Sequence, residues 1–248
     1  MVPEIFIINL ASSTARKANI TRQLADLGLA FTLFPAIDGR KEEHRLFGRY
    51  DNELNQHYRG QALSRGQLGC YASHYLLWQK CVALSRPIVV LEDDALIHPE
   101  PFLEFLNEID TLHQQFDCIR LFDNKRKAFA SVRVSGFNTV AIHKFNKGHL
   151  STTGYFLTPN GAKKLLQHSE HWYMPVDLYM DRYWANGVEC HGTVPACVTN
   201  DPKFDSVIGD GERETRSLVA RCRREWFNFS ELTRRTLHNF PGARKSRN

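Results

Sequence analysis

The sequence lacks the segments that carry a chain into or across a membrane. Nowhere in its 248 residues is there an uninterrupted apolar run of the roughly 18 residues that a transmembrane helix requires. Met1 leads almost directly into the apolar residues 5–8, without the basic segment and small-residue cleavage site of a secretory signal. We therefore expect a globular protein of the cytoplasm.

Paired cysteine motifs are also missing. The six cysteines include no Cys-x-x-Cys pair, and most stand in apolar surroundings. This disfavours a disulfide framework, and we expect buried free thiols in a reducing compartment. Cys190, His191 and Cys197 lie close in sequence, but their spacing matches no usual pattern of zinc ligands. Internal repeats and low-complexity tracts do not occur.

Charge is present but unevenly distributed. The chain carries a net charge of +5, while the part from Arg213 onward has ten basic and three acidic residues and therefore carries +7. The preceding part is nearly neutral, so it offers no basic face for nucleic acid, and no nucleic-acid-binding motif is present. The basic character belongs to the carboxyl-terminal tail.

The amino-terminal part has the pattern of a β-α-β unit. An apolar run at 5–10 predicts a strand, and Ile20 and Leu24 share the apolar face of a following helix. Gly28 ends that helix, and residues 30–34 predict a second strand. Two strands joined through one helix favour a parallel sheet.

The remaining sequence continues this alternation. We expect helices at about 64–83, 101–109, 160–166 and 175–184, and strands at about 88–92, 116–122, 131–143, 151–157 and 188–198. The Ser64-x-x-Gln67 capping box begins the first of these helices, and residues 41–61 predict irregular structure. The sequence thus predicts an α/β domain over 1–212, with a mostly parallel sheet flanked by helices, and a basic helical tail over 213–248.

Three consecutive carboxylates, Glu92, Asp93 and Asp94, follow the apolar run at 88–91. Ligands of open α/β sheets bind in the crevice at the carboxyl ends of the strands. Because adjacent carboxylates repel one another, a cation or hydrogen-bond donors must offset the repulsion. Oxygen ligands suit Mg²⁺ or Mn²⁺, and these ions suit a diphosphate. The alternative is a solvated acidic turn ahead of the helix start at Pro99.

Three segments resemble glycosyltransferase family 25, whose bacterial members build lipopolysaccharide or lipooligosaccharide. They are Ile7-Ile8-Asn9-Leu10 with Arg16; Leu63-Ser64-Arg65-Gly66-Gln67-Leu68-Gly69-Cys70 with Ser73-His74, running into Val90-Leu91-Glu92-Asp93-Asp94; and Gly154-Tyr155-Phe156-Leu157 with Gly161-Ala162 and Pro175-Val176-Asp177. They span residues 4–210 in the family's order. The resemblance implies a GT-A-like (Rossmann-like) fold, a UDP-sugar donor such as UDP-galactose, a divalent metal ion, and inversion at the anomeric carbon.

The resemblance also implies a set of donor-binding residues. These are Asn9, Arg16, Asp38, Gly66, Ser73, His74, Glu92 and Asp93. Structural roles are the alternative for several of them: Asn9 can form an Asx turn, Arg16 can be solvated, and a helical histidine is often buried and hydrogen-bonded. Gly66 and Gly69 each weaken a helix by about 1 kcal/mol, which suggests that the donor or a neighbouring strand approaches the backbone closely.

We expect Asp94 to be the principal metal ligand. Residues i and i+2 of a strand share a face, so Glu92 is the first choice for the second carboxylate and Asp93 the other. The metal would bridge two phosphates and stabilise the charge on departing UDP. Candidates for a third ligand are His191, Asn200 and Asp201, with His191 included in the expected set.

An inverting transfer also needs a general base for the acceptor hydroxyl. Asp177 is our choice, because Pro175 fixes the turn before it and Asp177 then opens a helix. Asp181 lies one turn further on the same helical face, and we expect it to assist. The alternative is that Asp177 merely caps that helix.

The tail has an amphipathic pattern. Trp226, Phe229, Leu232, Leu237 and Phe240 share one arc of a helical wheel, and Arg223, Arg224, Arg234 and Arg235 lie opposite. Such a helix is typical of peripheral binding to an anionic membrane surface, where a lipid-linked glycan acceptor would reside. The alternative is that the apolar arc packs on the body.

Two other functions fit the acidic cluster. A metal-dependent phosphohydrolase also uses aspartates at strand ends, and a non-catalytic sugar-binding or assembly subunit would keep the fold without the chemistry. The sequence leaves the transferred sugar, the acceptor linkage and the oligomeric state open.

Overall fold

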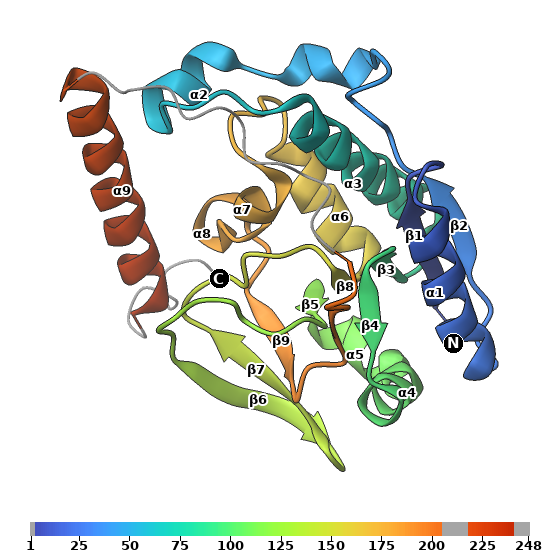
Figure 1. Ribbon diagram of the computed structural model, residues 1–248. Helices are drawn as coiled ribbons and strands as arrows, with labels where there is room; N and C mark the ends of the chain where they lie inside the picture. The colour runs from blue at the N-terminus through green and yellow to red at the C-terminus, as the bar shows by residue number, and fades with distance from the viewer. Residues whose placement is uncertain (1–2, 205–217, 241–248) are drawn as a thin grey trace.

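The structure is a computed structural model that describes residues 3–204 and 218–240 (Figure 1). The boundary expected at 212/213 and the ends of the basic tail, 213–217 and 241–248, lie outside these described residues.

Within residues 3–204 and 218–240, a mixed sheet of eight strands, in the order β2-β1-β3-β8-β5-β9-β7-β6, forms the centre of the fold. Its strands are β1 (Glu4–Asn9), β2 (Thr32–Pro35), β3 (Ile88–Glu92), β5 (Cys118–Arg120), β6 (Ser131–Phe137), β7 (Val140–Phe145), β8 (Gly154–Leu157) and β9 (His191–Val194). The β2-β1-β3 part is parallel, as is the β5-β9 pair. The β3-β8, β8-β5, β9-β7 and β7-β6 pairs are antiparallel. A separate ribbon pairs β4 (Ala95–Ile97) with β10 (Val198–Asn200).

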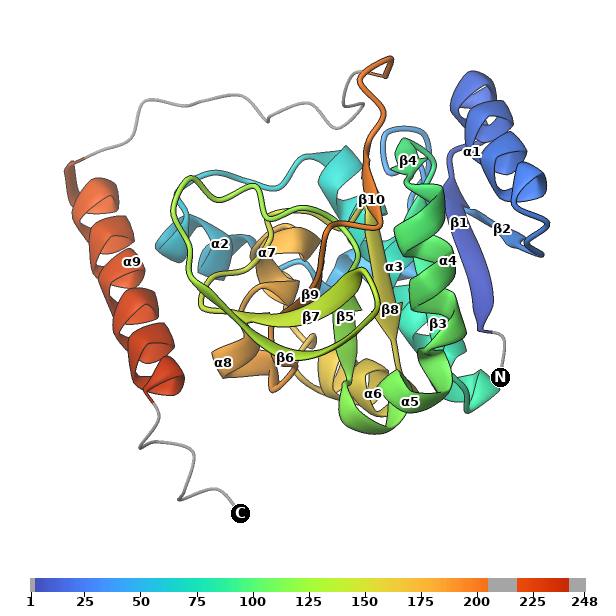
Figure 2. The ribbon, with the colours of Figure 1, turned by 90° about the horizontal axis from the view of Figure 1, so that it is seen from below.

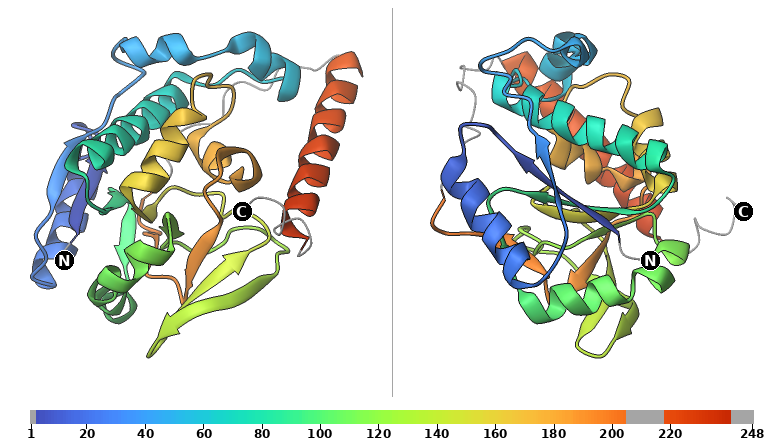
Figure 3. Two further views of the ribbon diagram at one scale, coloured as in Figure 1. Left: turned by 180° about the vertical axis from the view of Figure 1, so that it is seen from behind. Right: turned by 90° about the vertical axis from the view of Figure 1, so that its right-hand side faces the viewer.

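Helices cover both faces of this sheet (Figure 3). They are α1 (Thr14–Asp26), α2 (Asn52–Tyr58), α3 (Arg65–Leu84), α4 (Pro99–Asn107), α5 (Ile109–Gln115), α6 (Pro159–Gln167), α7 (Val176–Met180), α8 (Tyr183–Asn186) and α9 (Leu218–Asn239). One apolar cluster lies between the sheet and α3, α6 and α7, and a second between the sheet and α1, α4 and α5. Strand β3 contributes to both because its side chains alternate: Val90 faces the first cluster, Val89 and Leu91 the second.

The predicted α/β class with a helix-flanked sheet is confirmed. Parallel pairing joins the three strands β1, β2 and β3, which come first in the chain. The expected strand at 131–143 is a hairpin of β6 and β7. The segment 41–61 is not wholly irregular, since it contains a 3₁₀ turn at Arg45–Arg49 and helix α2. Asp51 caps α2 by accepting a hydrogen bond from the backbone N–H of Leu54, a local signal that periodicity does not reveal.

The expected capping box of α3 is present, with both of its reciprocal hydrogen bonds between Ser64 and Gln67. Gly69, one turn later, faces the chain segment after β2: an added Cβ would stand 2.3 Å from the carbonyl oxygen of Ile37 and 2.7 Å from the nitrogen of Gly39. At Gly66 the nearest atom would be 3.9 Å away. A close approach therefore explains Gly69, whereas Gly66 borders open space.

Helix α9 lies along one side of the molecule, next to α2 and α8 (Figures 1 and 2). Phe227 stacks on Tyr58 with ring centroids 4.6 Å apart, and Glu231 forms an ion pair with Arg182 through bonds of 2.5 and 2.9 Å. The apolar arc faces away, since Trp226 and Phe240 are 71% and 63% exposed. The alternative in which this arc packs on the body is wrong: the helix docks through its other side.

No helix in the described ranges, 3–204 and 218–240, combines the length and the apolar character needed to cross a membrane.

The two glycines of α3 give a test of the fold. Gly69→Ala is expected to lower the free energy of unfolding by about 1–3 kcal/mol, because the new methyl group would overpack the backbone of 37–39. Gly66→Ala, the matched control, should raise it by up to about 1 kcal/mol through helix propensity alone. Urea unfolding of both variants measures the difference, and equal effects would contradict the close approach at Gly69.

Candidate active site

The carboxyl ends of the parallel strands β1, β2 and β3 meet the first turns of α3 around a cavity, which we call the first cavity. The predicted site residues that line it are Arg16, Asp38, Gly66, Ser73, His74, Glu92, Asp93 and Asp94. The site therefore lies in the crevice where ligands of open α/β sheets bind.

A second cavity of about 590 Å³ lies beside the first, between α7, the segment before β8 and the end of β10. Its polar lining includes Arg59, Lys125, Thr152, Asp177 and Asn200. Cys70, Glu92 and Asp94 line both cavities. These three residues form the junction of the two cavities, which is the place where groups bound on either side would meet.

Asp93 is buried and held by two donors. Its carboxylate accepts hydrogen bonds from the Asn9 amide at 2.8 Å and from the Arg16 guanidinium at 3.1 Å. Burial raises the pKa of Asp93, although both donors and the charge of Arg16 oppose this rise. Asn9 does not line the first cavity, so its position is that of a residue that orients Asp93.

Glu92 has a different environment. Its Oε1 lies 3.3 Å from His74 Nε2 and accepts a hydrogen bond of 2.5 Å from the Thr152 hydroxyl. Burial would raise the pKa of Glu92, but the hydrogen bonds and charge of these neighbours outweigh it and hold the pKa below its ordinary value. Glu92 is therefore an ionised acceptor aimed at the junction.

His74 is itself fixed from behind. The indole N–H of Trp78, which can only donate, bonds to the Tyr155 hydroxyl at 3.1 Å, and that hydroxyl lies 2.9 Å from His74 Nδ1. The tyrosine proton is then directed at Nδ1, which places the imidazole proton on Nε2, facing Glu92. This chain of hydrogen bonds connects the apolar core to the junction.

Asp94 is the least satisfied of the three carboxylates. Oδ1 is buried and has no hydrogen-bond partner within the described part of the chain, while Oδ2 lies 3.7 Å from Arg16. Burial and the charge of Glu92 raise the pKa of Asp94 to about 7, Asp93 adds to the rise, and Arg16 opposes it. An uncompensated buried carboxylate oxygen is an unfavourable arrangement that a cation would relieve.

The donor set around Asp94 fits a hard divalent ion. Asp94 and Glu92 present carboxylate oxygens at the junction, and Asn200 lines the same second cavity. Oxygen donors of this kind are the ligands of Mg²⁺ and Mn²⁺. The amide oxygen of Asn200 accepts a hydrogen bond of 2.8 Å from Lys125, so Asn200 would join the ligand set only after Lys125 moves.

The expectation for His191 is corrected by the structure. His191 packs against Phe116, with ring centroids 4.8 Å apart, and lines neither cavity. It begins β9 and pairs with Ile119 of β5, whereas the acidic triplet stands at the carboxyl end of β3. Asp201, the third candidate, is engaged by Asn19 through a 3.0 Å hydrogen bond.

Asp177 lies at the start of α7, half-buried, and lines the second cavity. Pro175 occupies the N-cap position, and no side-chain capping bond is present, so the helix-cap alternative for Asp177 is wrong. Asp177 shares the lining of this cavity with Glu92 and Asp94 at the carboxyl end of β3.

Asp181 has a structural position, which corrects its expected assisting role. It is buried, pairs with Arg120 at 3.2 Å, and accepts hydrogen bonds from the backbone N–H groups of His149 and Leu150, each at 3.0 Å. It does not line the second cavity. Asp181 therefore anchors α7 to β5 and to the segment before β8 instead of sharing a proton with Asp177.

Two further predicted residues serve packing as well as the cavity. Ser73 accepts a hydrogen bond from the N–H of Ile37 at 2.9 Å and donates to the carbonyl of Gly69 at 2.8 Å. Asp38 accepts hydrogen bonds from Arg40, which help to hold its pKa below the ordinary value even though burial opposes this. Their hydrogen-bonding capacity is largely used within the protein.

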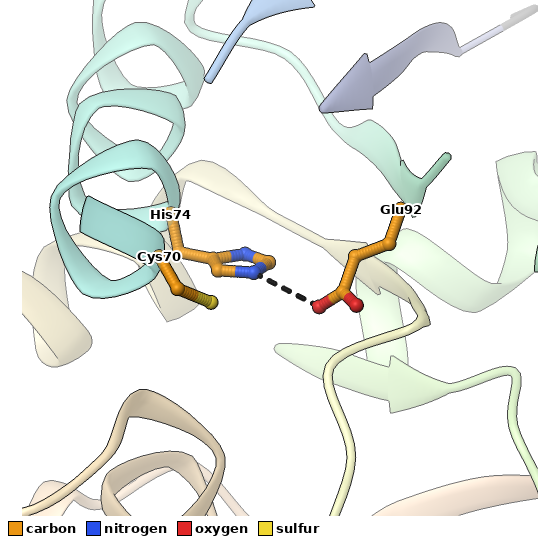
Figure 4. A group of neighbouring side chains, drawn as sticks. All are labelled: Cys70, His74 and Glu92. Atoms are coloured by element: carbon orange, nitrogen blue, oxygen red, sulfur yellow. Dashed lines mark hydrogen bonds and ion pairs between the residues drawn. The ribbon is translucent and has the colours of Figure 1, made fainter. Parts of the chain in front are cut away.

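Sequence reasoning did not assign Cys70, Thr152 or Lys125 to the site. Cys70 precedes His74 by one helical turn, so it shares that face of α3, and helical spacing alone could have found it. Figure 4 shows its thiol beside His74 and Glu92. Thr152 and Lys125 reach the site from segments after β5 and before β8, and no local pattern predicts this.

The family model described as glycosyltransferase family 25 (LPS biosynthesis protein) matches residues 2–180. The lacto-N-neotetraose biosynthesis glycosyltransferase LgtE of Neisseria meningitidis is 26% identical over 97% of this chain and 91% of its own length. The lipooligosaccharide biosynthesis protein lic2B of Haemophilus influenzae is 24% identical over 66% of this chain and 62% of its own.

Animal proteins match a similar region. The mouse protein named inactive glycosyltransferase 25 family member 3 is 27% identical over 71% of this chain and 31% of its own length. The chain spans about a third of the length of these animal relatives. The family match covers well over half of the sequence and includes β1, α3, β3 and the start of α7. The chain belongs to glycosyltransferase family 25.

Proposed function

We propose that the protein transfers a hexose, with galactose as the first candidate, from a UDP-sugar to a hydroxyl group of a lipooligosaccharide or lipopolysaccharide glycan, with inversion at the anomeric carbon. The observation that carries the proposal is the junction of two cavities at Glu92 and Asp94. One cavity lies at the strand ends where nucleotides bind, and the other holds a carboxylate suited to receive a proton.

In this proposal the nucleotide part of the donor occupies the first cavity. Arg16 brings a positive charge to the diphosphate, and Glu92, held ionised by His74 and Thr152, accepts hydrogen bonds from the sugar or ribose hydroxyls. Asp94 with Glu92 would hold Mn²⁺ or Mg²⁺. Such an ion, when bound, offsets the negative charge that develops on the departing diphosphate.

The acceptor would enter the second cavity. Its hydroxyl proton moves to the Asp177 carboxylate while the hydroxyl oxygen attacks the anomeric carbon and the bond to the UDP oxygen breaks. Attack from the side opposite the leaving group inverts the configuration. Arg59 and Lys125 add positive charge to the lining of this cavity, which suits an acceptor that carries anionic groups.

Asp94 gives the first test. Asp94→Asn is expected to lower kcat by at least about 10²–10³-fold. The variant loses the negative charge that would hold the cation, and without the cation the charge on the leaving group is not stabilised. Asp123→Asn, an exposed aspartate outside both cavities, is the matched control and should retain activity. Product formation from UDP-galactose with manganese present is the measurement, and circular dichroism checks the fold.

The same assay separates the proposal from its rivals. A phosphohydrolase would release inorganic phosphate from nucleotides faster than any sugar is transferred, with no acceptor present. A non-catalytic subunit would show no turnover and no effect of Asp94→Asn on its binding role. Either result would overturn the proposed transfer.

Asp177 and Asp181 give a paired test. Asp177→Asn should lower kcat by about 10²–10⁴-fold with little change in the KM of the donor, since Asp177 lines only the second cavity. Asp181→Asn should instead destabilise the fold by about 3–5 kcal/mol, because it leaves the buried Arg120 unpaired. Steady-state kinetics together with urea unfolding measure both. Loss of stability in Asp177→Asn with normal kcat would refute its role as base.

We also propose that α9 holds the enzyme at an anionic membrane surface. Its outward arc contains Trp226, Phe229 and Leu237, which are 71%, 60% and 61% exposed. Arg223 and Arg234 stand nearer to the edge of this arc on the helical wheel than Arg224 and Arg235 do, and their charges would meet lipid headgroups at about 1 kcal/mol each. A second copy of the protein would carry the same +7 tail and would be repelled from this helix. An anionic lipid surface is therefore the better partner for the exposed arc.

Vesicles containing phosphatidylglycerol provide the measurement for α9. The double variant Trp226→Ser, Phe229→Ser is expected to bind them at least about tenfold more weakly, since each side chain buries apolar area worth more than 1 kcal/mol in the interface. Val132→Ser, Val134→Ser removes exposed apolar residues of β6 and is the matched control. Equal vesicle binding by the wild type and the α9 variant would refute the membrane anchor. Sugar transfer to a soluble acceptor should be the same in both proteins.

A further inference from the structure

A sulfur, a nitrogen and an oxygen ligand converge at the junction. Cys70 and His74 lie one turn apart on α3, and Glu92 ends β3 opposite them (Figure 4). One ligand atom from each residue lies within 4.8 Å of the others, and His74 Nε2 is 3.3 Å from Glu92 Oε1. Among the residues that the structure describes, this is the one such group of three His, Cys, Asp or Glu side chains.

The chemistry of this set differs from that of the acidic triplet. Mg²⁺ and Mn²⁺ prefer oxygen ligands, whereas a thiolate with an imidazole selects a softer ion such as Zn²⁺. Zinc takes bonds of about 2.0–2.3 Å in a tetrahedron, so its ligand atoms stand about 3–4 Å apart. The three ligand atoms lie within 4.8 Å of one another, so zinc binding would draw them closer together than they stand in the structure.

The surroundings of His74 support a ligand role. Metal-binding histidines are oriented by a hydrogen bond at the second ring nitrogen, and here Tyr155 lies 2.9 Å from Nδ1. The tyrosine hydroxyl can accept as well as donate. When Nε2 binds a metal, the imidazole proton therefore moves to Nδ1 and is donated to Tyr155. The Cys70 thiol proton leaves to solvent as the thiolate binds.

We propose that Cys70 Sγ, His74 Nε2 and Glu92 Oε1 form a binding site for Zn²⁺, with the fourth coordination position open to the cavities. This site is separate from the proposed Mn²⁺ or Mg²⁺ position at Asp94, but the two share Glu92. Occupation by zinc removes Glu92 from the donor side. Zinc is therefore an inhibitor that competes with the UDP-sugar. This inhibition rests on the proposed function, whereas the binding of zinc to the three residues does not.

Cobalt is the spectroscopic probe for this site. Co²⁺ added to the purified full chain should give a thiolate-to-cobalt charge-transfer band that saturates at one equivalent, because Cys70 supplies the sulfur. Cys70→Ser should abolish the band, and Cys222→Ser, which removes the exposed cysteine of α9, should leave it intact. Cobalt held by oxygen ligands alone gives no such band. No band in the wild type, or a band that persists in Cys70→Ser, overturns the proposal.

Zinc titration gives the second measurement. Calorimetry with Zn²⁺ should show a dissociation constant at least about 100-fold larger for Cys70→Ser than for the wild type. Loss of a residue that only orients a metal ligand already lowers metal affinity by about 10–100-fold. In transfer assays zinc should raise the donor KM of the wild type and act much more weakly on Cys70→Ser. Equal zinc affinity in both proteins refutes the site. Absence of any transfer refutes the proposed function alone, since cobalt spectra still decide the site.

Discussion

Three adjacent carboxylates at the end of a buried strand are the constraint on which this structure depends. They cannot share one environment, because their mutual repulsion grows as water is excluded. The fold gives each a different partner: Asp93 receives Asn9 and Arg16, and Glu92 receives a histidine and a threonine. Asp94 keeps a buried oxygen without a partner. Within the described part of the chain, the least satisfied carboxylate of the three therefore lies where the two cavities meet.

The partners of this triplet come from distant parts of the chain and hold those parts together. Arg16 belongs to α1, His74 to α3, and Thr152 to the segment before β8. Behind His74, the hydrogen bonds to Tyr155 and Trp78 continue into the apolar cluster between the sheet and α3, α6 and α7. The site and the core are therefore one hydrogen-bonded structure, and its polar residues are positioned by apolar packing.

Much of this arrangement is predictable from local sequence. The apolar run of β3, the capping box at Ser64 and the β-α-β opening are short-range patterns, and each produced the expected element. His191 and Asp181 were misplaced because their roles depend on which strands become neighbours, and spacing carries no information about that. A helical wheel identified the two faces of α9, but which face meets the body is decided by partners such as Arg182 and Tyr58.

Helix α7 is short, with Asp177 in its first turn and the Asp181 anchor at its end. Any change that loosens the buried ion pair with Arg120 would therefore displace the opposite end of the same helix. A mutagenesis survey that scores product formation alone would rank both aspartates as equally essential. Distinguishing an anchor from a reactive group in this family thus requires that folding and turnover be followed side by side in every variant.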